Sequence, residues 1–369
     1  MNTSSAGGAL RVVHLPARTP YVRKLRAAGF RTVNGTDAAG AVVPVDVSAA
    51  WLLDHRPFTW FDVLHLHHIE FEDPADLERL LDACGAARTR VVCTAHDLRA
   101  MFGDDSGLHK RLRVVDAAGA AWICLTRGSR TELGGILGRE VEAAVIPHGY
   151  VVDPDSLGAG PPPRANPAPR FLLYGSMRAN RDQLAALLNW SLSTTDPDSR
   201  LELLVRGLSP VELRASDGVV LRLLDAARAD RRVITTMRPY PTDREVVEAA
   251  LAADALLLPY LWATHSGQLE LAFDLGMLAV ASSVGHLPEQ AERHRGLVAE
   301  PEWFDWTNGN PYTFGERFVA ALDRAHQRVA AGSAAARSDE PRPLNRDFID
   351  YRRTEHQQIL AAHQRVYSD

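Results

Sequence analysis

Short apolar runs alternate with amphipathic segments along the chain. In the first half, the runs that predict strands are Arg11–Leu15, Val63–His67, Arg90–Thr94, Ala121–Leu125 and Val145–Ile146. The segments between them with the leucine and alanine spacing of helices are Tyr21–Gly29, Pro74–Ala86, Leu108–Ala117 and Gly128–Leu137. Strands that alternate with helices in this way are typical of an α/β domain, in which a parallel sheet has helices on both faces.

The alternation stops at Asp153–Arg170, which is rich in proline and glycine and has no periodic apolar face. Such a composition predicts a linker. The strand pattern then restarts at Arg170–Tyr174, Leu201–Val205, Val233–Thr236, Ala255–Pro259 and Leu278–Ser282. The helical segments between these strands are Gln183–Ser193, Val211–Ala227, Asp243–Ala253 and Gly267–Leu275.

A small-residue stretch, Ala330–Asn345, precedes a closing helix of about Arg346 to Val366. We therefore expect an α/β chain of two Rossmann-like, doubly wound parallel-sheet domains. The first spans residues 1–152, the linker 153–169 and the second domain 170–335, while residues 346–369 form a helix that returns to the first domain. Open parallel sheets bind ligands beyond the carboxyl ends of their strands, so the loops there are the first places to search.

Composition narrows the function. The chain has 369 residues and a formal net charge of -5, which disfavours general nucleic-acid binding. The N-terminus has no signal-peptide pattern, and no apolar run is long enough to span a bilayer, so we expect a cytoplasmic protein without a transmembrane segment. Cys84, Cys93 and Cys124 are an odd number without motif spacing, and we expect reduced, mostly buried thiols without structural zinc.

The strongest local signal lies between Asp254 and Pro288, where an apolar strand, a polar and aromatic loop, a helix and a second strand follow one another. Ser266 suits the N-cap of the helix, and Gly267 allows a ligand to approach the backbone. Free amides of Gly267, Gln268 and Leu269 at the helix start form a natural diphosphate site. Glu270, one turn inside, suits the hydroxyls of a ribose, although an ordinary capped helix has the same pattern.

A second signal is the segment Phe171–Asp182, in which a strand runs into Gly175 and is followed by Arg178 and Arg181. The forked donors of arginine match phosphate oxygens and can offset the charge of a leaving diphosphate without a metal. A solvated loop with unrelated arginines is the alternative. A third signal is His96 with Asp97 at the end of a buried strand, where an imidazole can orient a substrate or simply bond to its own loop.

Asp62–Glu70 contains three histidines, His65, His67 and His68, and has a carboxylate at each end. His65 and His67 share one face of the strand, which raises zinc as an alternative, but the chain has neither a cysteine–histidine quartet nor an H-E-x-x-H helix. Two Asp-Pro-Asp triplets, Asp153–Asp155 and Asp196–Asp198, lie in turn-like contexts. We predict no metal site and no requirement for a divalent metal.

Taken in order, these segments resemble the retaining GT-B glycosyltransferases, of the group 1 or family 4-like superfamily. The resemblance covers most of the chain through strand order, and is sharper around His96, Arg178 and Glu270. It implies a GT-B fold, in which two Rossmann-like domains face a central cleft, and sugar transfer from a UDP- or GDP-sugar to a small-molecule or glycan acceptor with retention of configuration. The donor is a substrate, and the resemblance implies no required cofactor. The arginine-rich composition and small size are compatible with polysaccharide or natural-product biosynthesis in a bacterium. The sequence leaves an oligomer open.

The resemblance also implies roles for individual residues. His96 and Asp97 take the catalytic positions. Arg18, Thr19, His67 and His68 line the acceptor side. The donor-binding set is Gly175, Ser176, Arg178, Arg181, His265, Ser266, Gly267, Gln268, Leu269 and Glu270.

One position departs from the family pattern. The family has a glutamate eight residues before Glu270, facing the sugar hydroxyls, and this chain has Trp262 there. Two alternatives to a glycosyltransferase therefore stay open: a GT-B-like nucleotide-sugar epimerase, and a non-catalytic homologue that acts as a binding partner.

Overall fold

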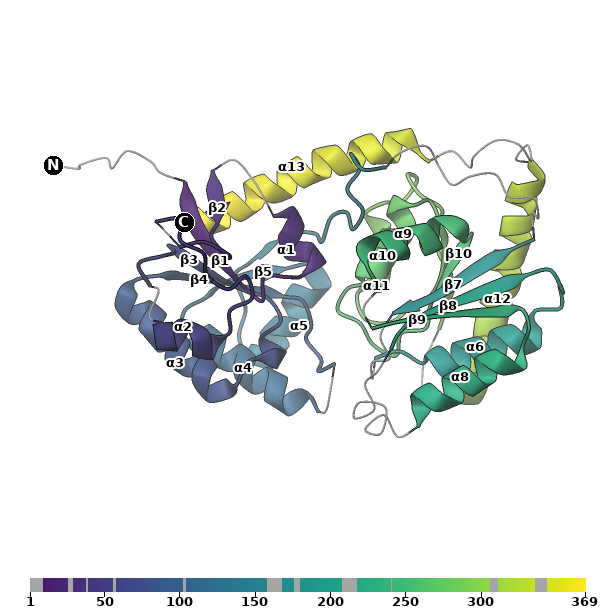
Figure 1. Ribbon diagram of the computed structural model, residues 1–369, viewed down its shortest axis with the longest axis horizontal. Helices are drawn as coiled ribbons and strands as arrows, with labels where there is room; N and C mark the ends of the chain where they lie inside the picture. Colours follow the sequence, from purple (N-terminus) through teal and green to yellow (C-terminus); the bar gives the residue numbers. More distant parts are fainter. Residues whose placement is uncertain are drawn as a thin grey trace. The chain divides into compact units, whose positions relative to one another are not determined.

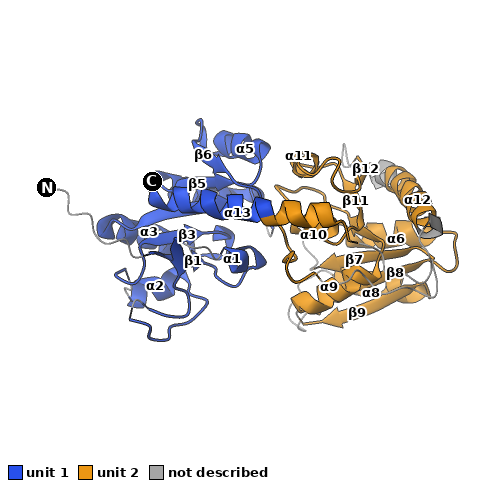
Figure 2. Cartoon of the chain, turned by 90° about the horizontal axis from the view of Figure 1, so that it is seen from above, with its two compact units in different colours: residues 1–149, 354–369 blue, residues 150–353 orange. Residues whose placement is uncertain are grey.

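The computed structural model describes residues 9–25, 29–37, 39–55, 58–101, 104–157, 168–175, 180–207, 218–239, 241–305, 311–335 and 344–369. The chain divides into two compact units, coloured separately in Figure 2. Unit 1 comprises Met1–Gly149 and Thr354–Asp369, and unit 2 comprises Tyr150–Arg353. Each unit is built on a parallel sheet of six strands, so the expected α/β fold class is confirmed.

Unit 1 follows the alternation that the sequence predicts (Figure 1). Its elements are β1 (Leu10–Leu15), α1 (Pro20–Lys24), β2 (Phe30–Thr32), α2 (Ala49–His55), β3 (Val63–Leu66), η1 (Ile69–Phe71), α3 (Pro74–Ala87), β4 (Arg90–Ala95), α4 (Asp105–Ala117), β5 (Ala121–Cys124), α5 (Arg127–Leu137) and β6 (Ala143–Val145). The sequence analysis missed β2 and α2. The strand β2 has only three residues, too few to show a period.

The sheet of unit 1 has the order β2-β1-β3-β4-β5-β6. Alternate side chains of each strand point to opposite faces, so the sheet is buried on both. One face carries Val13, Leu64 and Cys93 and packs on α2, α3, α4 and α5. The other face carries Val12, Val63 and Val92 and packs on α1 and on the last helix of the chain.

Unit 2 contains β7 (Arg170–Gly175), α6 (Gln183–Ser193), β8 (Arg200–Arg206), α8 (Val219–Ala229), β9 (Val233–Arg238), α9 (Asp243–Ala252), β10 (Ala255–Leu258), α10 (Gly267–Asp274), β11 (Leu278–Ser282), α11 (Leu287–Glu292), β12 (Glu302–Phe304) and α12 (Pro311–Ala335). The predicted start of a helix at Val211 lies outside the described residues, and α8 begins at Val219. The small-residue stretch from Ala330 is helical as far as Ala335, because alanine is a strong helix former.

The strand order of unit 2 is β12-β11-β10-β7-β8-β9. One face packs on α9, α10 and α11, and the other on α6, α8 and α12, with Trp190 fully buried in the second layer. The order reverses between β7 and β10, which are neighbours in the sheet although they are far apart in the chain. Because of this reversal, the loops that follow β7 and β10 lie next to each other at one edge of the sheet. These two loops contain the strongest sequence signals of unit 2.

The closing helix α13 (Arg346–Ser368) contributes to both units. Phe348 and Tyr351 pack in the core of unit 2, whereas Ile359, Leu360 and Tyr367 pack on the sheet of unit 1. Cys84, Cys93 and Cys124 are free thiols and are buried. None of the described helices is both long and apolar enough to cross a lipid bilayer.

Candidate functional site

The loops that follow β7 and β10 in unit 2 are joined to each other. Asp182 donates its backbone amide to the carbonyl of Pro259 at 3.0 Å, and Leu261 donates to Asn180 at 2.8 Å. Arg181 and Tyr260 form an isolated antiparallel bridge, with the Arg181 guanidinium 5.5 Å from the centre of the Tyr260 ring. The two loops leave neighbouring strands at the point where the strand order reverses, which is where open α/β sheets bind ligands.

Gly175, the last residue of β7, is the centre of this site. Its φ of +118° favours glycine, and a Cβ at this position would lie 2.6 Å from Arg181 Nη1 and 2.7 Å from Gln268 Nε2. Both side chains donate to the carbonyl of Tyr174, Gln268 at 2.9 Å and Arg181 at 3.2 Å. Three residues of the predicted donor set, one each from β7, the loop after it and α10, therefore meet at the end of β7. Ser176 and Arg178 lie outside the described residues.

The start of α10 has the predicted cap. Ser266 is 2% exposed, and its hydroxyl accepts a hydrogen bond from the amide of Leu269 at 3.1 Å. The amide of Leu269 is therefore engaged in the cap, contrary to the expectation that it is free for a phosphate. The side chain of Gln290 forms two hydrogen bonds with the backbone of Ser266. Its Oε1 accepts from the Ser266 amide and its Nε2 donates to the Ser266 carbonyl, both at 2.8 Å. His265, Gly267 and Gln268 are half-buried beside it.

Glu270 is buried in a network of protein groups. Gln290 Nε2 donates to its Oε1 at 2.9 Å, His294 Nε2 lies 3.3 Å from its Oε2, and Arg352 of α13 forms an ion pair with the same oxygen. The expected contact of Glu270 with a ribose stays a prediction. None of these three partners was predicted from the sequence.

The Arg352 guanidinium also forms an ion pair with a second carboxylate of α10, that of Asp274. Its Nε donates to Asp274 Oδ1 at 2.8 Å, and Asp274 Oδ2 accepts from the amides of Val151 at 2.6 Å and Val152 at 3.0 Å. Burial raises the pKa of Asp274, and the nearby Arg352 opposes that shift. Glu270 and Asp274 are four residues apart in α10, so their carboxylates lie on one face of the helix. This spacing is the feature of the sequence that could have indicated a buried cation between them.

In unit 1, four imidazoles gather where β1, β3 and β4 end. We call His14, His65, His67 and His96 the histidine cluster; each is 2% exposed or less. The register pairs His14 with His65, and alternation places His67 and His96 on the same face. His14 Nδ1 lies 3.0 Å from His67 Nε2, and His67 Nδ1 lies 3.2 Å from His96 Nε2. His14 was not among the predicted site residues.

The His65 ring is held at both nitrogens. Nδ1 lies 2.7 Å from the Tyr367 hydroxyl of α13, and Nε2 lies 2.8 Å from Thr94 Oγ1. Burial, with a contribution from His363, lowers the pKa of His14 to about 3, and burial also lowers the pKa of His65 and His67. These three rings are therefore neutral near pH 7 and keep their lone pairs.

The predicted catalytic pair lies at the edge of the histidine cluster. His96 and Asp97 line a small pocket together with His67, His68 and Thr94. His68 stacks on His96 with 4.7 Å between ring centres, and its Nδ1 lies 3.5 Å from Asp97 Oδ2. The structure thus brings together His67, His68, His96 and Asp97, all four from the predicted set.

Arg18 and Thr19 lie in the loop after β1 and have structural partners. Thr19 is the N-cap of α1, with its hydroxyl accepting from the amide of Val22 at 3.1 Å. The exposed side chain of Arg18 pairs with Asp46 at 3.0 Å. Their predicted place on the acceptor side stays a prediction.

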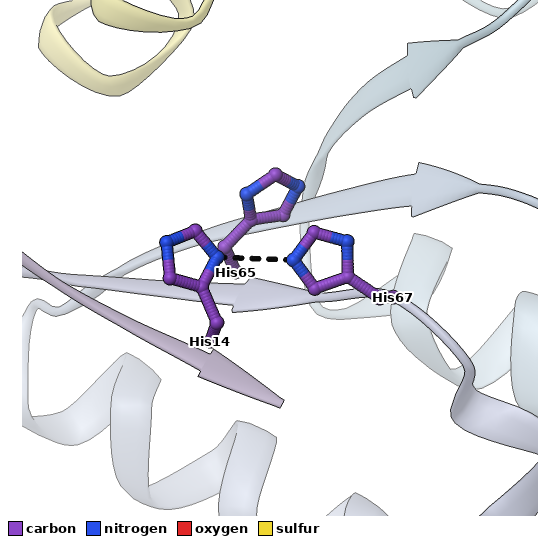
Figure 3. Close-up of side chains that lie close together, drawn as sticks. All are labelled: His14, His65 and His67. Carbon is purple, nitrogen blue, oxygen red and sulfur yellow. Dashed lines mark hydrogen bonds between the residues drawn. The ribbon is translucent and has the colours of Figure 1, made fainter. Parts of the chain in front are cut away.

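Among the residues that the structure describes, three members of the histidine cluster could hold a metal ion. Each of His14, His65 and His67 offers a ring nitrogen, and these atoms lie within 4.8 Å of one another (Figure 3). The two Asp-Pro-Asp triplets instead form local turns, in which Asp153 and Asp196 each accept the amide two residues later at 2.9 Å.

Comparison by sequence finds no relative: no protein-family model and no curated protein matches the chain. Comparison by structure finds many. Alr3699/HepE of Anabaena, solved with UDP and glucose, aligns with a TM-score of 0.59 and 14% identity over 95% of this chain and 98% of that chain. Sucrose-phosphate synthase of Thermosynechococcus elongatus aligns with a TM-score of 0.54 and 14% identity over 96% of this chain and 100% of that chain.

A third solved structure, described as trehalose-6-phosphate from E. coli bound with UDP-2-fluoro glucose, aligns with a TM-score of 0.58 and 12% identity. It covers 87% of this chain and 76% of its own. The similarity extends through both units in each case. The chain therefore has the GT-B fold, with two Rossmann-like sheets, that is found in glycosyltransferases.

Proposed function

We propose that the protein is a glycosyltransferase that takes a sugar from a UDP- or GDP-sugar and passes it to a small-molecule or glycan acceptor. The observation that carries this proposal is the convergence of Gly175, Arg181 and Gln268 beside the N-terminus of α10. A guanidinium, a bare backbone at a glycine and the positive end of a helix are together suited to a diphosphate. Solved structures of the same fold that hold UDP or UDP-glucose support this proposal.

In the proposed reaction, the bond between the anomeric carbon and the diphosphate breaks, and an acceptor oxygen forms the new bond on the same face of the sugar. The acceptor proton passes to the leaving diphosphate. Arg181, together with Arg178 and Ser176 of the same loop, stabilises the charge that develops on that diphosphate, so no divalent metal or other cofactor is required. His265, Gly267 and Glu270 complete the donor site.

Unit 1 is proposed to supply the groups that act on the sugar and the acceptor. His96 and Asp97 take the catalytic positions, and the acceptor side is lined by Arg18, Thr19, His67 and His68. A neutral imidazole can accept or donate a hydrogen bond to a sugar hydroxyl without the cost of a buried charge. We place the reaction in the bacterial cytoplasm, in the biosynthesis of a polysaccharide or natural product.

The test is to incubate the chain with UDP- and GDP-sugars, with and without a panel of small acceptors, and to measure free nucleoside diphosphate. The proposal predicts release that depends on the acceptor, with a product of retained configuration. An epimerised sugar that forms without acceptor would instead indicate a nucleotide-sugar epimerase. Trp262, in the place of a family glutamate, motivates a further outcome: nucleotide binding without turnover would indicate a non-catalytic binding protein.

A further inference from the structure

Three imidazoles of unit 1 converge from two neighbouring strands. His14 lies on β1 and His65 on β3, and His67 follows β3 directly, as Figure 3 shows. The ring centres of His65 and His67 are 4.1 Å apart, and each lies 5.3 Å from that of His14. Exposures of 0%, 0% and 2% place the three rings in the interior. Of the three, only His67 has a place in the proposed transfer chemistry, on the acceptor side, so His14 and His65 have no role assigned by it.

The spacing of their nitrogens is close to that of metal ligands. Zinc–nitrogen bonds of about 2.0–2.1 Å in a tetrahedral site leave two ligating nitrogens about 3.3 Å apart. His14 Nδ1 and His67 Nε2 face each other at 3.0 Å. The third ring, His65, offers one nitrogen, and the three ligand atoms lie within 4.8 Å of one another.

The hydrogen bonds around the rings also match a metal site. A ligating histidine normally donates its second ring nitrogen to a fixed acceptor, which sets its tautomer and orientation. His67 has His96 Nε2 at 3.2 Å from its Nδ1. Whichever nitrogen of His65 ligates, a hydroxyl of Thr94 or Tyr367 stands at 2.7–2.8 Å to accept from the other.

His14 has one ring nitrogen without a protein partner. Its Nε2 is buried and has no hydrogen-bond partner among the described residues. Ligation through Nδ1, the nitrogen that faces His67, leaves the ring proton on Nε2, so this N–H group stays without an acceptor and subtracts from the affinity. The enthalpy of three metal–nitrogen bonds must therefore exceed this cost.

We propose that His14, His65 and His67 together bind one transition-metal ion, of the kind that imidazoles prefer and most readily Zn²⁺, at a buried site in unit 1. The ion joins β1 to β3 and, through His65 and Tyr367, to α13. Its role is structural, because the three rings are buried and tie neighbouring strands together. The proposal does not depend on sugar transfer, and it is compatible with a transfer reaction in which no metal contacts the diphosphate.

The test is metal analysis of the purified full chain. The protein is produced in medium with added Zn²⁺, passed over a chelating resin and analysed by mass spectrometry for metals. The proposal predicts about one equivalent of Zn²⁺ per chain, and a shift of Tm to lower temperature after unfolding and refolding with a strong chelator. Refolding with Co²⁺ in place of Zn²⁺ is expected to produce the visible absorption of a site with nitrogen ligands.

Two variants and one control complete the test. His14→Gln and His67→Gln are expected to lower bound metal at least about tenfold, as loss of one of three ligands should. His109→Gln, which alters a half-buried histidine of α4, is expected to keep the metal. Circular dichroism confirms that each variant is folded, and if neither ligand variant folds, the cobalt spectrum of the wild type decides. Less than a tenth of an equivalent of metal in folded wild type, with no cobalt spectrum, would overturn the proposal.

Discussion

Arg352 and Asp274 form an ion pair in the interior of unit 2, with Nε 2.8 Å from Oδ1 and side chains that are 2% and 1% exposed. The same guanidinium also forms an ion pair with Glu270, so one cation neutralises two buried carboxylates. Arg352 thereby ties α13 to the helix whose N-terminus is the proposed diphosphate site.

Replacing this cation should destabilise the protein strongly. Arg352→Met is expected to lower the free energy of unfolding by about 3–5 kcal/mol, because two buried carboxylates lose their partner. The matched control is Arg353→Met, which removes the neighbouring, half-exposed arginine that pairs with Asp155 and Asp350 and should cost less than about 1 kcal/mol. Urea denaturation measures both. Equal losses in the two variants would contradict the role assigned to Arg352.

Two glycines of unit 2 allow the energetic cost of a left-handed backbone to be distinguished from the cost of a steric clash. Gly285 and Gly276 both have positive φ, of +54° and +62°. A Cβ on Gly285 would lie 1.8 Å from the carbonyl oxygen of Ala263, whereas one on Gly276 would meet nothing within 4 Å. Gly276→Ala should therefore cost only the conformational term of about 1–2 kcal/mol.

Gly285→Ala should cost about 1–3 kcal/mol more than Gly276→Ala, because the backbone of the loop after β10 must move. The same movement should weaken UDP or GDP binding, since that loop leads into Ser266. Thermal unfolding and nucleotide titration of the two variants provide the comparison. If Gly285→Ala is no less stable than Gly276→Ala, the tight packing of this loop is refuted.

Gly175 should be more important for binding than for folding. Gly175→Ala places a methyl group among Arg181 and Gln268, so it is expected to weaken nucleotide binding at least about tenfold, or about 1.4 kcal/mol. Gly138→Ala is the control, because Gly138 also has positive φ, +71°, but has open space around its Cα and lies in unit 1. If Gly175→Ala binds the nucleotide with unchanged affinity, the end of β7 is not part of the donor site.

The pair of Asp230 and Arg232 makes stability depend on pH. Hydrogen bonds from Arg232 lower the pKa of the Asp230 carboxyl to about 2 in the folded state. A depressed carboxyl pKa stabilises the fold above the unfolded value of about 3.9, and this stabilisation is lost as pH falls through the folded value. The shift corresponds to about 2 kcal/mol for this largely buried pair.

The measurement is the difference in unfolding free energy between wild type and Asp230→Asn from pH 6 to pH 2. We expect the difference to be greatest at pH 6 and to shrink below pH 4. Asp225→Asn removes an exposed partner of Arg228 and should change the unfolding free energy by less than about 0.5 kcal/mol throughout. A difference for Asp230→Asn that is constant with pH would contradict this account.

The sequence predicted the sheets well, because buried parallel strands are continuous apolar runs, as Ala255–Leu258 illustrates. It also indicated the loops that follow strands as the place for a site, but the meeting of Arg181 and Gln268 at Gly175 was not predicted, because it depends on β7 and β10 being neighbours in the sheet. His14 was missed because a single polar residue inside an apolar strand resembles an isolated core histidine. The role of Arg352 was hidden for a different reason: its partner Glu270 is 82 residues away, and no local pattern reports such a contact.

Calorimetric titration of UDP and GDP into the full chain tests the central claim most directly. The account predicts that at least one of the two binds, that Arg181→Gln weakens this binding about tenfold or more, and that Arg244→Gln, at an exposed arginine of α9 in the same unit, does not. Absence of heat with both nucleotides, or equal affinity of wild type and Arg181→Gln, would contradict a diphosphate site at the junction of β7, β10 and α10.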